Sequence, residues 1–170
     1  MKSAAPSGTR RLATAAVLGC YTLLLGLIAL NNITDPGTNW PFVQHVLAMD
    51  TTFESPRLTW RAITNPMLQG LAYAAIIATQ AVAAGLCAVG FVRLLRRRAR
   101  PGGEFERAKR AAILGVTLSL VLWLGGFLAI GAEWFAMWQS ERWNSSEPAT
   151  RYLIAGGIAL LLLFQRDDRA

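Results

Sequence analysis

The chain has 170 residues, 54% of them hydrophobic, and it carries a formal net charge of +7 at pH 7. A chain of this length fits a single domain. Its apolar residues are gathered in long uncharged runs, which argues against a soluble domain. The arginine-rich segment abuts one of these runs. Its charge therefore predicts contact with anionic lipid and argues against binding to nucleic acid.

The uncharged runs predict membrane-spanning helices. Three of them reach the roughly 20 residues that match the hydrocarbon core of a bilayer: Leu12–Leu30, Met67–Val92 and Ala111–Ala132. A fourth run, Tyr152–Gln165, is shorter. A helix that begins at Pro148, with Ser146 as its cap, would span about 27 Å at ~1.5 Å per residue. We therefore predict a fourth span over residues 148–165, and the alternative is a C-terminal helix that enters the membrane without crossing it.

Basic residues are distributed unevenly among the segments that connect these runs. Thirteen of the 17 Lys and Arg residues lie in the N-terminal segment, in the loop 93–110 or at the C-terminus. Positively charged loops stay on the cytoplasmic side of a membrane. The prediction is a single integral membrane domain over residues 1–170, an all-α four-helix transmembrane bundle. Both termini would be cytoplasmic, and residues 31–66 and 133–147 would form the outer loops.

Small residues recur every three or four positions along the second run, at Gly70, Ala74, Ala78, Ala81, Gly85 and Ala88. This spacing lets helix backbones approach closely in lipid, so we expect a compact bundle with little interior volume. Gln80 lies near the middle of the same run, where a polar side chain faces protein. An interhelical hydrogen bond is the favoured interpretation of Gln80. The alternative is contact with a quinone or another polar head group.

The first outer loop contains three signals for helix starts. Asn39 can cap a short helix over Pro41–Met49, because Pro41 would lie in its first turn. Ser55-Pro56 is a second start signal, and Asn65-Pro66 opens the second span. The loop is therefore predicted to contain one or two short interfacial helices.

Five of the six tryptophans and the only histidine lie between the predicted spans, in the outer segments. Tryptophan prefers a membrane–water boundary, so these segments are the place to expect a ligand or a partner. If the third helix continues beyond the bilayer, the spacing of Trp134 and Trp138 places both on one face. Acidic and basic residues of the two loops are expected to form salt bridges that tie the loops together. The candidate ligand- or partner-binding residues, which we call the outer cap, are His45, Asp50, Trp60, Arg61, Glu133, Trp134 and Trp138.

The sequence predicts neither a metal site nor a catalytic site. His45 and Met49 are four residues apart, a spacing that suits a copper or haem ligand pair, but the two cannot close a site by themselves. No cofactor of its own is expected, and a bound quinone or lipid is the alternative. The first three runs contain no ionisable Asp, Glu, Lys, Arg or His, which argues against ion-coupled transport.

Two strings in the outer loops resemble a known family. His45-Val46-Leu47-Ala48-Met49-Asp50-Thr51-Thr52-Phe53, followed by Trp60-Arg61-Ala62-Ile63, is similar to one signature of a bacterial family of predicted small integral membrane proteins of unknown function, the domain-of-unknown-function 2165 family. Glu133-Trp134-Phe135-Ala136-Met137-Trp138-Gln139-Ser140 and Trp143-Asn144 resemble its second signature. The resemblance covers nearly the whole chain. It implies a bacterial inner membrane and four spans, and it implies no activity, cofactor or catalytic residue.

Three functions are compatible with these patterns. The favoured one is an accessory subunit of a larger inner-membrane complex, respiratory or another redox assembly, that docks through its helices and outer cap. The alternative is a protein that binds a lipid or quinone head group, with the outer-cap tryptophans as the wall and Arg61 and Glu133 as polar anchors. A small membrane enzyme that uses Glu133, His45 and Asp50 as acid–base groups is a minor alternative. The expected partners are membrane lipids and a larger membrane protein, without nucleic acid or a soluble substrate.

Overall fold

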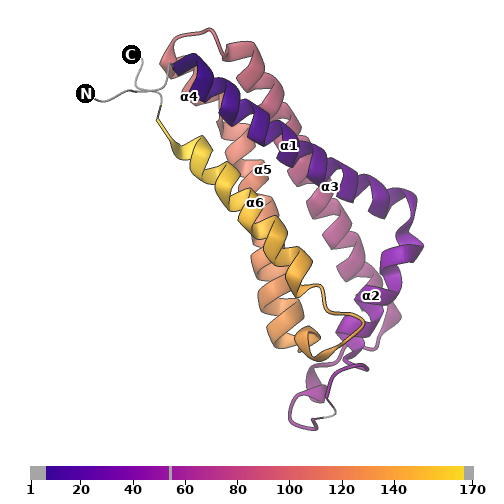
Figure 1. The fold of residues 1–170 in the computed structure, drawn as a ribbon. Coiled ribbons are helices and arrows are strands. Elements are labelled where there is room, and N and C mark those ends of the chain that lie inside the picture. Colours follow the sequence, from indigo (N-terminus) through magenta and orange to yellow (C-terminus); the bar gives the residue numbers. More distant parts are fainter. Residues whose placement is uncertain (1–6, 54, 167–170) are drawn as a thin grey trace.

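The computed structural model describes residues 7–53 and 55–166, and within these ranges the chain forms helices and no strand. Four helical segments are long and apolar enough to cross a membrane. They are α1 (Ser7–Thr34), α3 (Pro66–Arg97), a rod made of α4 (Gly102–Ala108), α5 (Arg110–Leu120) and η2 (Val121–Trp134), and α6 (Ser146–Phe164). Shorter helices connect them, namely α2 (Pro36–Ala48), η1 (Thr59–Arg61) and η3 (Met137–Gln139). The predicted all-α bundle with four spans is confirmed (Figure 1).

The two ends of the bundle are built differently. The beginning of α1 and the end of α6 lie next to α4, and we call this end the α4 end (Figure 1). Arg11 Nη1 there donates to the carbonyl oxygens of Arg98 and Arg100, at 2.8 and 2.7 Å. Lys109 Nζ donates to the Gln165 carbonyl at 2.7 Å. These bonds tie α1 to the turn after α3, and the end of α6 to the junction of α4 and α5. We call the opposite end, where α2 and the long connections lie, the α2 end.

Polar side chains and prolines set the helix starts. Asn65 Oδ1 accepts the backbone N–H of Met67 at 2.9 Å, and Pro66 opens α3, so this predicted start is confirmed. The predicted cap of α6 is wrong. Ser146 lies inside the helix, and its own N–H bonds to Asn144 Oδ1 at 3.0 Å.

The predicted helix of the first outer loop exists, but it begins earlier than expected. α2 begins at Pro36, where proline occupies the first turn, and Pro41 lies inside the helix. Asn39 is consequently not a cap, and its amide bonds to a side chain of α1. The segment 93–110, predicted as a loop, is also mostly helical, because α3 extends to Arg97 and α4 begins at Gly102.

Glycines bring the helices into close contact in the part of the bundle near the α4 end. A Cβ placed on Gly90 of α3 would lie 2.5 Å from the Cβ of Ala112 on α5. A Cβ on Gly115 would lie 2.7 Å from the backbone nitrogen of Cys87. Such small residues let helix backbones approach in a membrane. The core that forms around them includes Leu18, Leu25, Ala83, Val116 and Leu163.

Half of the small-residue stripe predicted to pack α3 faces outward, and the other half, Gly70, Ala81 and Ala88, is only partly buried. Ala74, Ala78 and Gly85 are exposed, whereas α3 buries a different line of residues: Tyr73, Gln80, Ala83, Cys87, Gly90 and Leu94. Both lines have helical spacing, so periodicity alone could not choose between them. The buried line combines larger side chains that fill the core with Gly90, where α5 approaches.

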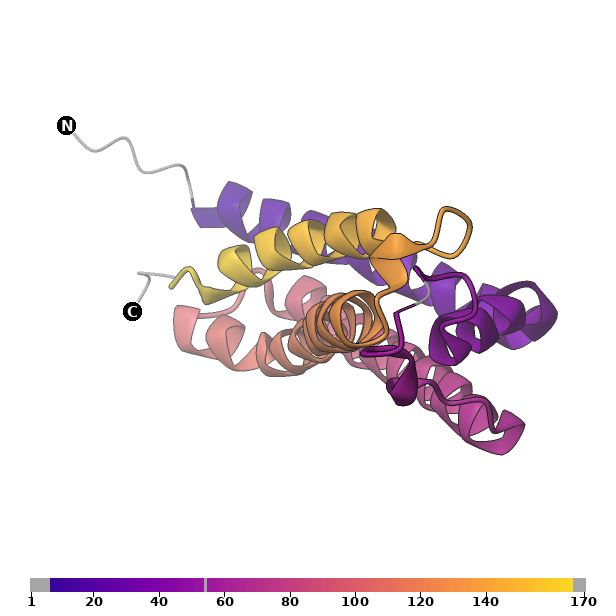
Figure 2. The same cartoon turned by 90° about the horizontal axis from the view of Figure 1, so that it is seen from below.

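Towards the α2 end the bundle opens. α3 packs closely against α5 but scarcely contacts η2, and α2 lies beside α3 and the end of α1 (Figures 1 and 2). Val46 of α2 and Met49, the residue that follows this helix, pack against Ala132, Phe135 and Met137 in a second apolar cluster. The expectation of little interior volume is wrong, because the spread helices leave cavities that α2 does not fill.

The third span does not continue past Trp134 as a regular helix. η2 is a π-helical segment, in which the N–H of Phe135 still bonds to the carbonyl five residues back, at Ile130, with an N–O distance of 3.0 Å. Ala136 then adopts a left-handed conformation, with φ 51°, and breaks the helix. The sequence predicted that Trp134 and Trp138 share one helix face. Because the helix breaks between them, this prediction is wrong.

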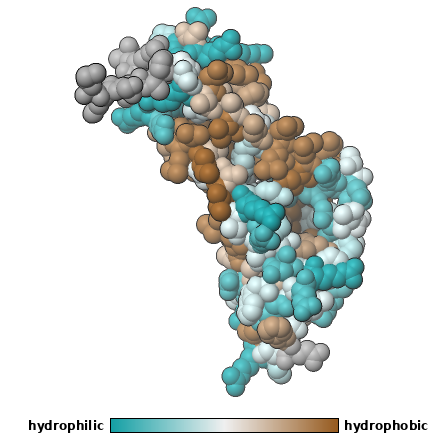
Figure 3. Space-filling model, viewed as in Figure 1, coloured by the Kyte–Doolittle hydropathy of each residue, from teal (hydrophilic) through white to brown (hydrophobic). Residues whose placement is uncertain are grey.

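Hydrophobic side chains cover much of the length of the spans. Figure 3 shows them over the bundle near the α4 end, with hydrophilic side chains at the tip of that end and again towards the α2 end. Exposed leucine, isoleucine and valine side chains occur on all four spans, for example Leu23, Val82, Leu124 and Leu161. An apolar outer surface of this kind is what a bilayer requires of a spanning bundle.

Candidate functional site

A cavity of about 410 Å³ lies where the bundle opens. It is enclosed by the end of α1, by α2, α3 and η2, and by the beginning of α6 with the residues before it. We call it the polar cavity, because its lining includes Asn31, Asn32, Asn39, Gln80, Trp123 and Arg142. This size lies within the range of small-molecule binding sites.

A chain of side-chain amides crosses one wall of the polar cavity. Asn39 Nδ2 donates to Asn32 Oδ1 at 2.6 Å, and Asn32 Nδ2 donates to Gln80 Oε1 at 2.7 Å. The interhelical hydrogen bond predicted for Gln80 is therefore confirmed. The oxygens of Asn32 and Gln80 each accept one of these bonds, so Gln80 Nε2 remains as a donor at one end of the chain and Asn39 Oδ1 as an acceptor at the other.

Two further donors belong to the same cavity. Trp123 is 3% exposed, and its indole N–H lies near the Tyr21 hydroxyl but forms no hydrogen bond of normal geometry within the described ranges. Its ring packs against Phe127 and Tyr152, at centroid distances of 4.9 and 4.6 Å. Arg142 lies over the ring of Trp143 at 4.9 Å and forms no ion pair with any residue that the structure describes. Since no acidic residue lines the cavity, it is rich in donors and carries positive charge.

A second cavity, of about 210 Å³, adjoins the first. The two share Phe42, Val43, Ile76 and Phe127, and the rings of Phe42 and Phe127 are stacked at 6.2 Å. We call it the apolar cavity, because its other lining residues are all apolar: Val46, Leu47, Ala72, Leu122, Gly126, Ile130, Gly131, Phe135 and Met137. Five of its lining residues belong to η2, and π-helical segments are frequent at functional sites.

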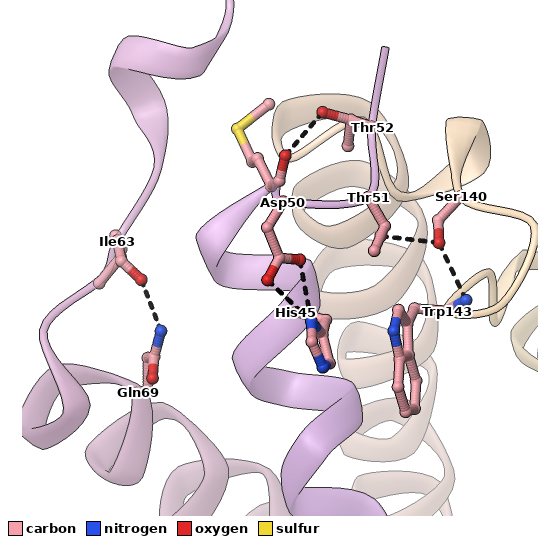
Figure 4. A network of polar contacts seen from close by, with 9 residues as sticks. His45, Asp50, Thr51, Thr52, Ile63, Gln69, Ser140 and Trp143 are labelled. Atoms are coloured by element: carbon pink, nitrogen blue, oxygen red, sulfur yellow. Dashed lines mark hydrogen bonds and ion pairs between the residues drawn. The ribbon is translucent and has the colours of Figure 1, made fainter. Parts of the chain in front are cut away.

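Of the predicted outer cap, His45 and Asp50 form one pair. His45 Nδ1 lies 2.8 Å from Asp50 Oδ2, and the imidazole is stacked on Trp143 at 4.8 Å (Figure 4). Next to them, Thr51 Oγ1 donates to Ser140 Oγ at 2.9 Å. Met49 is buried in the apolar cluster, so it does not join His45 as a ligand pair.

Trp60, Arg61 and Trp134 form a second group. The Arg61 guanidinium carbon lies 4.5 Å from the ring of Trp134 and 5.7 Å from that of Trp60. Arg61 Nη1 also donates to the carbonyl of Trp134 at 3.2 Å. Trp60 is 69% exposed and Trp134 46% exposed, so much of this aromatic surface remains open.

The two remaining cap residues lie apart from these groups. Trp138 packs edge-on against Phe53 at 6.0 Å. Glu133 is exposed and forms no ion pair among residues 7–53 and 55–166. The predicted salt bridges between the outer loops do not form in the described part of the chain. The loops are joined instead by hydrogen bonds and ring contacts, such as the Phe53 N–H to Gln139 Oε1 bond of 2.9 Å.

The predicted site and the observed cavities are different places. None of the seven outer-cap residues lines either cavity. Among the polar-cavity residues, sequence reasoning singled out only Gln80. Two signals could have found others: the Asn31-Asn32 pair at the end of the first apolar run, and Trp123, the only tryptophan inside a span.

In the described part of the chain, His45 and Asp50 are the only two candidate acid–base residues that lie in contact. No group of three or more His, Cys, Asp and Glu residues there could hold a metal ion. Glu133 forms no hydrogen bond with His45 or Asp50, so the residues of the minor enzyme hypothesis are not assembled into one network.

Four apolar spans and an apolar outer surface define a small multi-pass integral membrane protein. A family of predicted small integral membrane proteins (DUF2165) matches residues 10–166, and the chain belongs to this family. A comparison with curated proteins found no match, and a comparison with solved structures found none either.

Proposed function

We propose that this protein binds one amphipathic membrane molecule, a lipid or a quinone, with its polar head in the polar cavity. The observation that carries the proposal is the junction of a donor-lined cavity with an apolar one inside the bundle. A polar head would bond to the amides and Arg142, and an apolar chain would extend past Phe42 and Phe127. Binding sites commonly combine a few polar groups with an apolar lining in this way.

The direction of the amide chain supports a head group that accepts hydrogen bonds. Gln80, Trp123 and Arg142, whose side chains carry N–H donors, all line the polar cavity. Phosphate oxygens and quinone carbonyl oxygens are acceptors, whereas an ammonium head group would be repelled by Arg142.

Mild purification followed by solvent extraction and mass spectrometry tests this proposal. The wild-type protein should retain about one lipid or quinone per chain, and the mass identifies which class it is. Gln80→Leu and Trp123→Phe each remove a donor, so each should lower the retained amount several-fold. Trp123→Phe removes the N–H and keeps a smaller aromatic ring in place.

Outer-cap variants provide the matched controls. Arg61→Ala and Trp134→Phe change residues outside both cavities, so they should leave the retained molecule unchanged. Loss of the molecule in these variants, with retention in the cavity variants, would place the site at the outer cap instead. Equal retention in all four variants would refute the polar cavity.

We also propose the accessory-subunit role as a second candidate. Two exposed features support it: the Trp60–Arg61–Trp134 group and the outward-facing small residues of α3. Tryptophan and arginine dominate binding energy at many interfaces, and small residues allow close helix packing in lipid. Affinity purification from native membranes should then return a stoichiometric membrane partner that is lost in Trp60→Ala. Recovery of the chain alone would contradict this role.

The kind of membrane and the orientation of the protein in it are also part of what we propose. We place the protein in a bacterial inner membrane with the α4 end in the cytoplasm, because most of its arginine lies at that end. The cavity entrance would then lie in the outer half of the membrane.

A further inference from the structure

A hollow of about 320 Å³ lies at the α4 end, away from both cavities described above. It is formed by the last turns of α3 and by α4, and it is lined by Arg93, Arg97, Glu104, Arg107 and Ala108. Arg93 and Arg97 are one helical turn apart and so share a face of α3. α4 packs against that face and adds Arg107. We call this site the basic hollow.

The ion pairs of α4 leave positive charge in the basic hollow. Glu104 pairs with Arg97, and Glu106 pairs with Lys109 at 2.6 Å, outside the hollow. Both acidic residues of α4 are thereby engaged. Arg93 and Arg107 form no ion pair with any residue in the ranges 7–53 and 55–166. Three arginines and one glutamate line the hollow, so its lining carries a net charge of about +2.

The position of the hollow suits a lipid. Val89 and Val92 of α3 are 45% and 41% exposed, and Arg93 follows them directly along the helix. An acyl chain that lies along these valines would bring its head group to the level of Arg93. Basic pockets at the ends of spans commonly bind anionic lipid head groups, and guanidinium matches phosphate in geometry.

We infer that the basic hollow binds the phosphate group of an anionic membrane lipid, with Arg93 and Arg107 as the main contacts. This site is independent of the polar cavity, and neither requires the other. Glu104 limits its affinity, because it occupies Arg97 and adds negative charge next to the phosphate position.

Native mass spectrometry of the full-length protein in detergent, titrated with phosphatidylglycerol, tests this inference. The wild-type chain should bind phosphatidylglycerol more tightly than zwitterionic phosphatidylcholine with the same acyl chains. Each arginine removed should weaken binding about fivefold, so Arg93→Gln with Arg107→Gln should weaken it by roughly 20- to 30-fold. Gln80→Leu, which changes the polar cavity, should leave this difference unchanged.

A charge-matched control separates a site from general attraction. Arg98→Gln with Arg100→Gln removes the same charge from the neighbouring turn, outside the hollow, and should weaken binding by about twofold or less. Equal weakening by both double variants would overturn the proposal. Inorganic phosphate at millimolar concentration should not displace the lipid, and full displacement would show a phosphate-ion site instead.

A variant that is expected to bind the lipid more tightly tests the same site without removing an arginine. It gives an answer even where the arginine variants do not fold. Glu104→Gln frees Arg97 and should tighten phosphatidylglycerol binding several-fold. Glu141→Gln removes one acid at the α2 end and should have no effect on this site. Unchanged affinity in Glu104→Gln would contradict the assignment.

Discussion

Gln80 connects α1, α2 and α3 through one chain of amides. Asn32 is buried, and it uses its oxygen for Asn39 and its nitrogen for Gln80. Replacing Gln80 by leucine would leave the Asn32 N–H without an acceptor inside the protein. Interhelical hydrogen bonds in membrane proteins are individually modest, and leaving a buried partner unsatisfied adds to the loss.

The first prediction follows from this chain. Gln80→Leu should lower the free energy of unfolding by about 0.5–2 kcal/mol, measured by unfolding in mixed detergent micelles. The double variant Asn32→Leu, Gln80→Leu should lose less than the sum of the two single variants, because it leaves fewer unsatisfied groups. Strictly additive losses would show that the two amides do not interact.

The sequence shows how deep in a span a polar residue lies, but it does not show which residue will be its hydrogen-bond partner. The position of Gln80 in an apolar run predicted a protein-facing amide, and that prediction is confirmed. Its partner Asn32 lies near a helix end, where asparagine usually meets water, so its position alone did not predict that it is buried. The cavity lining combines five helical segments and their connections, and no local pattern encodes such a combination.

The contact between α3 and α5 depends on glycine at one position of each helix. The second prediction is that Gly90→Ala destabilises the protein by about 1–3 kcal/mol, because its methyl group would overlap Ala112. Gly85→Ala is the matched control on the same helix. Its methyl group would meet nothing within 4 Å, so the unfolding free energy should stay the same or rise slightly. Equal losses in the two variants would contradict the packing described for α3.

Two left-handed residues end helices, and they should respond differently to glycine. The third prediction is that Ala136→Gly raises the unfolding free energy by about 0.5–1 kcal/mol, because φ 51° is strained for alanine. Met49 has φ 54°, but its side chain is 4% exposed and packs in the apolar cluster. Met49→Gly should therefore lower stability, since the lost packing exceeds the relief of strain. Thermal unfolding in detergent compares the two variants, and stabilisation by both would contradict the packing of Met49.

Spans and some helix starts were predictable because their causes are local. Asn65-Pro66 supplies a cap and a compatible first turn, and the structure begins α3 there. The start of α2 was missed because Asp35-Pro36 and Asn39-Trp40-Pro41 both contain proline after a capping residue. Which small-residue line of α3 is buried depends on how the other helices approach. A single sequence does not show that approach.

The arrangement of the whole molecule makes a prediction about its orientation in the membrane. The fourth prediction is that the α4 end faces the cytoplasm, because most of the arginine residues lie at that end. In a cysteine-free background, Asn144→Cys should react with a membrane-impermeant maleimide in intact cells. Arg100→Cys should react only after the membrane is permeabilised. The reverse pattern would invert the orientation and would place the polar cavity near the cytoplasm.

The bundle as a whole is closed at one end and open at the other. Glycine contacts close the α4 end, and the spread of α3 from η2 leaves the cavities towards the α2 end. This asymmetry agrees with a molecule bound inside the bundle, and it does not require a protein partner. The central claim is therefore that the polar cavity is a binding site for an amphipathic ligand.

Native mass spectrometry of the protein ejected directly from membrane vesicles tests this claim most directly. The wild-type chain should carry one lipid or quinone mass after loosely held lipids have been stripped. That mass should persist in the Arg93→Gln, Arg107→Gln variant and be lost in the Gln80→Leu, Trp123→Phe variant. A bare wild-type chain, or a bound molecule that the cavity variants retain in full, would contradict the account.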